Sequence, residues 1–481
     1  MSTALPKLAK NHAFIDGAWV GTPTFPVLDK ATGEELLRVP ELGQAETRQA
    51  IEAAHAAFGP WSRRVAKDRS QILRRWFDLI VAHADDLALI LTREQGKPLA
   101  EAKGEVLYGA SFVEYFAEQA KRIYGETVPS PKPDARIVIL RQPIGVVAAI
   151  TPWNFPCAMI TRKVTPALAV GCTAVVKPAG ETPLTALALA ALAEEAGVPR
   201  GVLNIVTSHN PVPVGRELTE NPLVRMVTFT GSTEVGKILM RQSAGTVKKL
   251  GLELGGNAPF IVFDDADLDK AVAGAMASKY RNAGQTCVCA NRIYVQAGVY
   301  DAFAARLAAE VGKLRVGCGT EAGVTQGPLI NEEGVKKVES HIADAVGKGA
   351  KVLCGGQRHT LGRTFFEPTI LTGVTGEMLV AREETFGPVA PLFEFATEEE
   401  VIAAANGTPF GLAAYFYSRD MGRVWRVAEA LEYGIVGINE GIISNEVAPF
   451  GGVKESGLGR EGSHHGVEEF LEIKYMMLGG L

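Results

Sequence analysis

GVVAAI (145–150), TAVVK (173–177), VLNIV (202–206) and MVTFTG (226–231) are four short β-branched runs within one stretch of the chain. Alanine- and leucine-rich segments such as TALALAALAEEAG (185–197) separate them. This alternation is typical of parallel βαβ units and a doubly wound sheet. A second such series runs from about residue 259 to residue 439, through PFIVF, NRIYV, PTIL, PVAPLFEF, AAYFYS and GIVGIN. We therefore predict an α/β fold with two doubly wound lobes and a ligand cleft between them.

The segments around these lobes have other patterns. From residue 44 to about residue 124, apolar residues recur at helical spacing, which predicts a helical region. The charged segment GETVPSPKPDARIVILRQP (125–143) then interrupts the pattern, and we interpret it as a projecting hairpin. Near the end of the chain, EIKYMMLGG (472–480) supplies a further apolar strand.

Composition limits the classes of function. A chain of 481 residues exceeds the size at which one core keeps growing, so two or more packed lobes are expected. The net charge of −5 and the scattered basic residues argue against nucleic acid as a partner. Six cysteines without dense, even spacing favour a reducing compartment, and no apolar stretch is long enough to cross a bilayer. We expect a soluble, cytoplasmic protein without a membrane partner.

Three segments contain candidate catalytic residues. GQTCVCANR (284–292) places Cys287 in a small, polar loop, where it is either a reachable nucleophile or an inert buried thiol. LELGGNAP (252–259) ends an apolar run in Glu253, which is either a general base or a solvated acid. PWNFP (152–156) holds Asn154 between two prolines, as an oxyanion donor or as the capping residue of a turn.

Seven motifs in order resemble the aldehyde dehydrogenase superfamily, from about Phe14 to the C-terminus. They are PWNFP, KPAGETP (177–183), FTGSTEVGK (229–237), LELGG, GQTCVCANR, EETFGPV (383–389) and PFGGVKESGLGRE (449–461). Within the family, the pair Cys287 and Cys289, the run MITRK (159–163) and EGIISNEVAPFGG (440–452) are similar to succinate-semialdehyde dehydrogenases.

This resemblance implies a domain organisation and an assembly. Residues 1–122 and 144–255 correspond to a dinucleotide-binding domain, and residues 256–446 to a catalytic domain. Residues 123–143 and 447–481 correspond to an oligomerisation element and C-terminal tail. A homodimer or homotetramer is therefore expected.

The resemblance also implies a reaction, the NAD(P)-dependent oxidation of succinate semialdehyde to succinate. Cys287 attacks the aldehyde to form a thiohemiacetal and then a thioester, while Asn154 and the Cys287 N–H stabilise the oxyanion. Glu253 activates the water that hydrolyses the thioester. Glutarate semialdehyde, or another ω-carboxy aldehyde, is an alternative substrate. A non-catalytic structural protein of the same fold is the alternative from a different class, but it would lack the nucleophile or the base.

The cofactor is not assigned to the one literal G-x-G-x-x-G, at 457–462, because that motif follows no buried strand and opens no apolar helix. The strand-to-helix turn at Gly231 and Ser232 is the better pyrophosphate site. Family relatives that prefer NAD usually have a glutamate three positions after Lys177, where this chain has Gly180. We therefore favour NADP, with NAD as the alternative if Glu181 takes that role. The family match adds Thr151, Pro152, Trp153, Glu384 and Phe386 as cofactor contacts, and no metal is expected.

Two arginines are candidates for holding the carboxylate of a semialdehyde, because a guanidinium binds a carboxylate through paired hydrogen bonds. Arg162 and Arg281 match carboxylate-binding positions in succinate-semialdehyde dehydrogenases, although either could instead form a structural ion pair. Ser444 or Asn445 could add a hydrogen bond. Cys289 is a candidate redox partner of Cys287 through a strained disulfide, or else a small hydrophobic residue.

Overall fold

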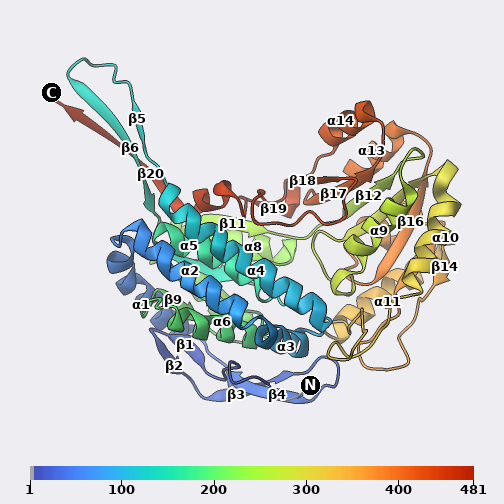
Figure 1. Ribbon diagram of the computed structural model, residues 1–481, viewed down its shortest axis with the longest axis horizontal. Helices are drawn as coiled ribbons and strands as arrows, with labels where there is room; N and C mark the ends of the chain where they lie inside the picture. Colours follow the sequence, from blue (N-terminus) through green and yellow to red (C-terminus); the bar gives the residue numbers. More distant parts are fainter. Residues whose placement is uncertain (1–4) are drawn as a thin grey trace.

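The computed structural model describes residues 5–481 and contains two α/β lobes and a projecting arm (Figure 1). Its first lobe is built on an eight-stranded sheet with the order β19-β11-β10-β7-β8-β9-β1-β2. The five central strands are parallel: β7 (Val146–Ile150), β8 (Thr173–Lys177), β9 (Leu203–Ile205), β10 (Val224–Thr230) and β11 (Lys249–Glu253). β7, β8, β9 and β10 are the four predicted β-branched runs, β11 is an additional parallel strand, and both faces of the sheet are covered by helices (Figure 1).

The helices of the first lobe come from two parts of the chain. Those of the N-terminal helical region are α1 (Gln44–Ser62), α2 (Ala66–Ala82), α3 (Ala84–Gln95) and α4 (Leu99–Gln119). Those between the strands are α5 (Ala158–Val170), α6 (Pro183–Glu195), α7 (Pro211–Glu220) and α8 (Thr233–Ser243). Every residue of α5 is buried, because α2 and α4 pack against it on the outer side (Figure 1).

The edges of the first sheet are antiparallel and come from the two ends of the chain. At one edge are β1 (Ala13–Ile15) and β2 (Ala18–Val20), followed in sequence by a separate hairpin of β3 (Pro23–Leu28) and β4 (Glu35–Pro40). At the other edge, β19 (Gly457–Leu458) pairs with β11. The C-terminal segment 447–481 therefore also contributes to the first lobe.

The second lobe has a seven-stranded sheet with the order β14-β15-β16-β13-β12-β17-β18. Its strands are β12 (Ala258–Val262), β13 (Ala290–Gln296), β14 (Lys351–Cys354), β15 (Thr369–Thr372), β16 (Val389–Phe395), β17 (Ala413–Tyr417) and β18 (Ile435–Ile438). Only β14 pairs antiparallel. The helices are α9 (Leu268–Lys279), α10 (Tyr300–Val311), α11 (Glu332–Gly347), α12 (Leu379–Arg382), α13 (Glu398–Asn406) and α14 (Met421–Ala430).

A three-stranded antiparallel sheet forms the arm, which projects from the body with the C-terminus at its tip (Figure 1). It consists of β5 (Glu126–Val128), β6 (Ala135–Pro143) and β20 (Leu471–Gly479). Apolar side chains along β20 are exposed, with Ile473 at 72% and Tyr475 at 59%. Within residues 5–481, no helix combines the length and apolarity needed to cross a membrane.

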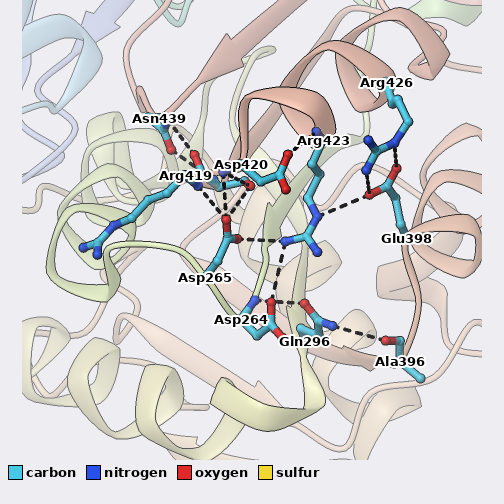
Figure 2. A network of polar contacts seen from close by, with 11 residues as sticks. Asp264, Asp265, Gln296, Ala396, Glu398, Arg419, Asp420, Arg423, Arg426 and Asn439 are labelled. Atoms are coloured by element: carbon cyan, nitrogen blue, oxygen red, sulfur yellow. Dashed lines mark hydrogen bonds and ion pairs between the residues drawn. The ribbon is translucent and has the colours of Figure 1, made fainter.

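The two sheets meet end to end at one place. The chain passes from the carboxyl end of β11 to the amino end of β12 in four residues, 254–257, so these ends of the two strands lie close together. The opposite end of the second sheet is closed by a polar network (Figure 2). There Asp265, after β12, accepts hydrogen bonds from Ser418 and from the backbone of Arg419 and Asp420, and it pairs with Arg423. The loops of Asn154, Glu253 and Cys287 lie at the junction of the two sheets and not at this end of the second sheet.

Candidate active site

The loop before Cys287 has an unusual backbone. Asn282, Ala283 and Gly284 are consecutive residues with positive φ, of 53°, 54° and 75°. Left-handed backbone costs a non-glycine residue about 1–2 kcal/mol, so neighbouring contacts must maintain this conformation. At Gly284 a Cβ would lie only 2.1 Å from the carbonyl oxygen of Gly387, which explains why glycine is required there. The loop ends with a half-buried Cys287, whereas Cys289 is fully buried with its thiol 3.5 Å from the Lys279 carbonyl.

Buried amides hold the nucleophile loop to Asn154. The Asn282 side-chain amide donates to the Asn154 carbonyl at 3.1 Å and to the Gln285 carbonyl at 3.2 Å. Asn154 in turn donates from Nδ2 to the same Gln285 carbonyl at 3.1 Å. A primary amide has two N–H groups, so the second N–H of Asn154 can serve an oxyanion. Asn154 and the loop that leads to Cys287 thus belong to one hydrogen-bonded unit.

Glu253 ends β11 and is 3% exposed. Within the part of the chain that the structure describes, its Oε2 atom has no hydrogen-bond partner. Burial, reinforced by the nearby charge of Glu461, raises the pKa of Glu253 well above its usual range. Three residues later, a Cβ on Gly256 would lie 2.6 Å from the Cys287 carbonyl oxygen, so the glycine allows the two loops to touch. A carboxylate whose pKa is raised is a stronger base toward water than an ordinary glutamate.

Arg162 and Lys163 of α5 both form ion pairs with Glu461. The Arg162 guanidinium also stacks 4.2 Å from the Phe450 ring centre, and among residues 5–481 its Nη2 atom has no hydrogen-bond partner. Burial raises the pKa of the Cys287 thiol to about 12, while the charge of Arg162 acts in the opposite direction. Arg162 is therefore ion-paired but keeps one unused donor.

Arg281 is half-buried, with its guanidinium carbon 5.2 Å from the Phe155 ring centre. It lines a cavity of about 850 Å³ together with residues of α9 and α10 and with Ile442. Of the two candidates in the loop after β18, Asn445 is exposed and its side chain accepts from the backbone of Val447 and Ala448. Ser444 is half-buried, so it is the better placed of the two.

The predicted cofactor residues lie at the carboxyl ends of the first sheet. Lys177 is 6% exposed and bonds the Pro178 carbonyl at 3.1 Å, and the Ser232 hydroxyl caps α8 by accepting from Val235. The buried hydroxyl oxygens of Thr151 and Thr230 have no hydrogen-bond partner within the described residues. The N-terminus of α8, a buried ammonium group and unused hydroxyls fit a phosphate- and ribose-bearing cofactor.

The other cofactor residues face this region from the second lobe. Glu384 accepts from the Gly256 backbone at 3.3 Å, and burial raises its pKa to about 7. Phe386 has a positive φ of 54° and meets Trp153 edge to face at 5.6 Å. Pro152, next to Trp153, is also half-buried. The literal glycine motif at 457–462 forms the short strand β19 and is followed by a 3₁₀ helix (His464–Phe470), not by an α-helix.

Sequence reasoning missed several buried charged residues. Lys97 and Glu105 form an ion pair in which each side chain is 1% exposed. Arg292 donates to the Asn257, Ala404 and Ala405 carbonyls and so anchors the loop after Glu253. Arg292 lies in the motif GQTCVCANR and Glu461 in PFGGVKESGLGRE, and this position within a family motif was the one sequence signal that could have indicated their roles. Lys97 and Glu105 stand in no quoted motif.

The comparisons agree with this geometry. The model of the "Aldehyde dehydrogenase family" matches residues 19–476. The chain therefore belongs to the aldehyde dehydrogenase family. A crystal structure of succinate-semialdehyde dehydrogenase from Burkholderia pseudomallei is 66% identical, covers 98% of this chain and 99% of that one, and has a TM-score of 0.98.

Characterised relatives differ in the substrate that their names give. Glutarate-semialdehyde dehydrogenase of Pseudomonas aeruginosa is 64% identical and covers 99% of both chains. 3-Sulfolactaldehyde dehydrogenase of Pseudomonas putida is 63% identical, over 99% of this chain and 98% of its own. An NADP-dependent succinate-semialdehyde dehydrogenase of Escherichia coli is 62% identical, over 98% of both chains. Identity does not separate these relatives, but all three names specify an aldehyde that carries an acid group.

Proposed function

We propose that the protein oxidises succinate semialdehyde to succinate. The observation that carries the proposal is a pair of arginines, Arg162 on α5 and Arg281 before the nucleophile loop, whose positive charges both act on the Cys287 thiol. Their charges can hold an acid group at one end of a short aldehyde while Cys287 reaches the other end. Ser444, half-buried in the loop after β18, is proposed as a further hydrogen-bond donor to the acid group. Glutarate semialdehyde is the second candidate, because a binding site for the carboxylate does not by itself fix how many carbons separate the carboxylate from the aldehyde.

In the proposed mechanism, Cys287 attacks the aldehyde carbon as a thiolate. Its raised pKa means that the resting thiol is protonated, so it gives up its proton to water before the attack, and the positive charges of Arg162 and Arg281 favour this ionisation. The second Asn154 N–H and the Cys287 backbone N–H stabilise the oxyanion of the thiohemiacetal. The nicotinamide cofactor, when bound, supplies a hydride acceptor. Glu253 takes a proton from the water that hydrolyses the Cys287 thioester.

For the cofactor we propose NADP in preference to NAD. Lys177, Thr151 and the α8 N-terminus would hold its adenosine and phosphate groups, with Glu384 and Phe386 on the nicotinamide side. No carboxylate stands at Gly180 to repel a 2′-phosphate. Glu181 is half-buried, and its charge acts on both Lys30 and Lys177. That arrangement supports Glu181 being engaged with lysines and not with a ribose.

We also propose that two or four copies associate in the cytoplasm through the projecting arm. The exposed apolar residues of β20 support this, since a monomer rarely exposes a contiguous apolar strand. Sedimentation velocity on the whole chain and on an Ile473→Lys/Tyr475→Lys variant tests the assembly. The variant is expected to be smaller, and an unchanged sedimentation coefficient would refute this role of β20.

The experiment that tests the substrate proposal is a set of initial rates on purified protein. Succinate semialdehyde, glutarate semialdehyde, 3-sulfolactaldehyde and uncharged butanal are compared with NADP and with NAD. We expect the highest kcat/KM with succinate semialdehyde and NADP. A higher value for either of the other acidic aldehydes would reassign the substrate but keep the anion site.

A further inference from the structure

The buried ion pair of Lys97 and Glu105 clamps both ends of the segment that contains Asn154. Lys97 follows α3 and donates from Nζ to the Asn154 carbonyl at 2.7 Å. Glu105 of α4 accepts from the backbone N–H of Cys157 at 2.9 Å, at the start of α5. Lys97 also sits 3.8 Å from the ring centre of Phe155, so the ammonium group is fixed from three sides.

A buried ion pair in this position is energetically unfavourable if its only role is to stabilise the fold. Removing two charges from water carries a desolvation penalty that an apolar pair of similar size avoids. Burial lowers the pKa of Lys97, and the charge of Glu105 opposes that shift. The pair has a specific geometric result: the peptide carbonyl of Asn154 receives one hydrogen bond from Lys97 and a second from Asn282 of the nucleophile loop.

We propose that Lys97 is a positioning residue for the oxyanion donor, with Glu105 as its support. The two hydrogen bonds to the Asn154 carbonyl fix the peptide from which the Asn154 side chain projects. They also set its distance from the loop of Cys287, because Asn282 bonds both segments. The inference rests on the role of Asn154 in the proposed mechanism but not on the identity of the aldehyde, since every aldehyde forms the same oxyanion.

The test is a double-mutant cycle on hydride transfer, measured as the burst of reduced cofactor in stopped flow. Removing one oxyanion donor costs about 10²–10³ in rate, which sets the upper limit for a residue that acts through Asn154. Lys97→Met should slow the burst by about tenfold or more, and equally for succinate semialdehyde and butanal. In an Asn154→Ala background, the same change should slow it by less than about threefold, because no positioned donor remains to be lost.

Two further variants separate positioning from folding. Lys97→Met/Glu105→Gln leaves no unpaired buried charge, so it serves if Lys97→Met alone is unstable. Glu94→Gln is the matched control: Glu94 is a buried carboxylate that accepts from Leu184 and Thr185 at the start of α6, as Glu105 does for α5. The control should lower the melting temperature without slowing the burst at saturating cofactor.

The outcomes are distinct. A burst slowed by the same factor with and without the Asn154 side chain would overturn the proposal, as would an unchanged burst in the folded double variant. If Asn154→Ala itself has no effect on the burst, the mechanistic role of Asn154 fails first, and the role of Lys97 fails with it. A preference for another aldehyde leaves the inference intact, because the burst is then read with that aldehyde.

Discussion

Replacing Arg281 by leucine should reduce activity toward acidic aldehydes selectively. Truncating one member of a buried, hydrogen-bonded charge pair costs roughly 2–5 kcal/mol. Because Arg281 is half-buried, the lower end of about 2 kcal/mol applies, and at about 1.4 kcal/mol per tenfold this is a ~30-fold fall in kcat/KM for succinate semialdehyde. Butanal has no carboxylate to lose, so its kcat/KM should change by less than about threefold on the same reasoning.

Initial rates on both aldehydes, with saturating cofactor, measure this difference. Arg306→Leu is the matched control, because Arg306 lines the same cavity but is exposed and pairs with Asp269. It should leave both substrates nearly unchanged. An equal loss for succinate semialdehyde and butanal in Arg281→Leu would refute the reasoning. Arg162 is a less clean probe, since its removal also deprives Glu461 of an ion-pair partner beside Glu253.

Three other changes have expected outcomes. Glu253→Gln should keep the burst of reduced cofactor but lose steady turnover. Because burial raises the pKa of Glu253, the stability of the wild-type protein falls as pH rises past the ordinary glutamate range. The melting temperature of the variant should therefore increasingly exceed that of the wild type from about pH 5 to about pH 8. Gly180→Glu should raise KM for NADP more than Gly180→Gln does. A Cβ at position 180 would lie 2.9 Å from His209 Nδ1, so the glutamine variant controls for steric strain. Equal effects of the two substitutions would place the binding site of the NADP 2′-phosphate elsewhere. Asp265→Asn should lower the free energy of unfolding by about 1–3 kcal/mol without changing kcat/KM. Burial raises the pKa of Asp265, but its hydrogen bonds and the charge of Arg423 outweigh burial and lower that pKa. Chemical denaturation should therefore show that the loss of stability disappears below about pH 4.

The parallel core of both sheets could be predicted because most of its strands are short, continuous apolar runs with a helix after them, β11 and β18 being exceptions. The edges could not. Gly457–Leu458 has no strand pattern of its own and joins β11 only because the C-terminal segment returns to the first lobe. The segment 447–481, predicted to belong to the oligomerisation element and C-terminal tail, therefore supplies β19 to the first sheet as well as β20 to the arm.

The candidate site was predictable where a motif is local and unpredictable where the partners are distant. Cys287, Glu253 and Asn154 each stand in a short motif, and the fold brings their loops into contact. Lys97 lies 57 positions from Asn154, and Glu461 lies 299 positions from Arg162, so no periodicity connects them. No local sequence pattern predicts the ion pair of Arg162 with Glu461. This pair nevertheless determines how many N–H groups of Arg162 remain to bind a substrate.

The central claim is that this aldehyde dehydrogenase recognises the acid group of its substrate. Its most direct measurement is the ratio of kcat/KM for succinate semialdehyde to that for butanal, which share a four-carbon aldehyde chain but differ in the carboxylate. If the anion contacts are each worth about 2 kcal/mol, wild-type protein should prefer the semialdehyde by at least ~30-fold. A ratio near one would contradict the account.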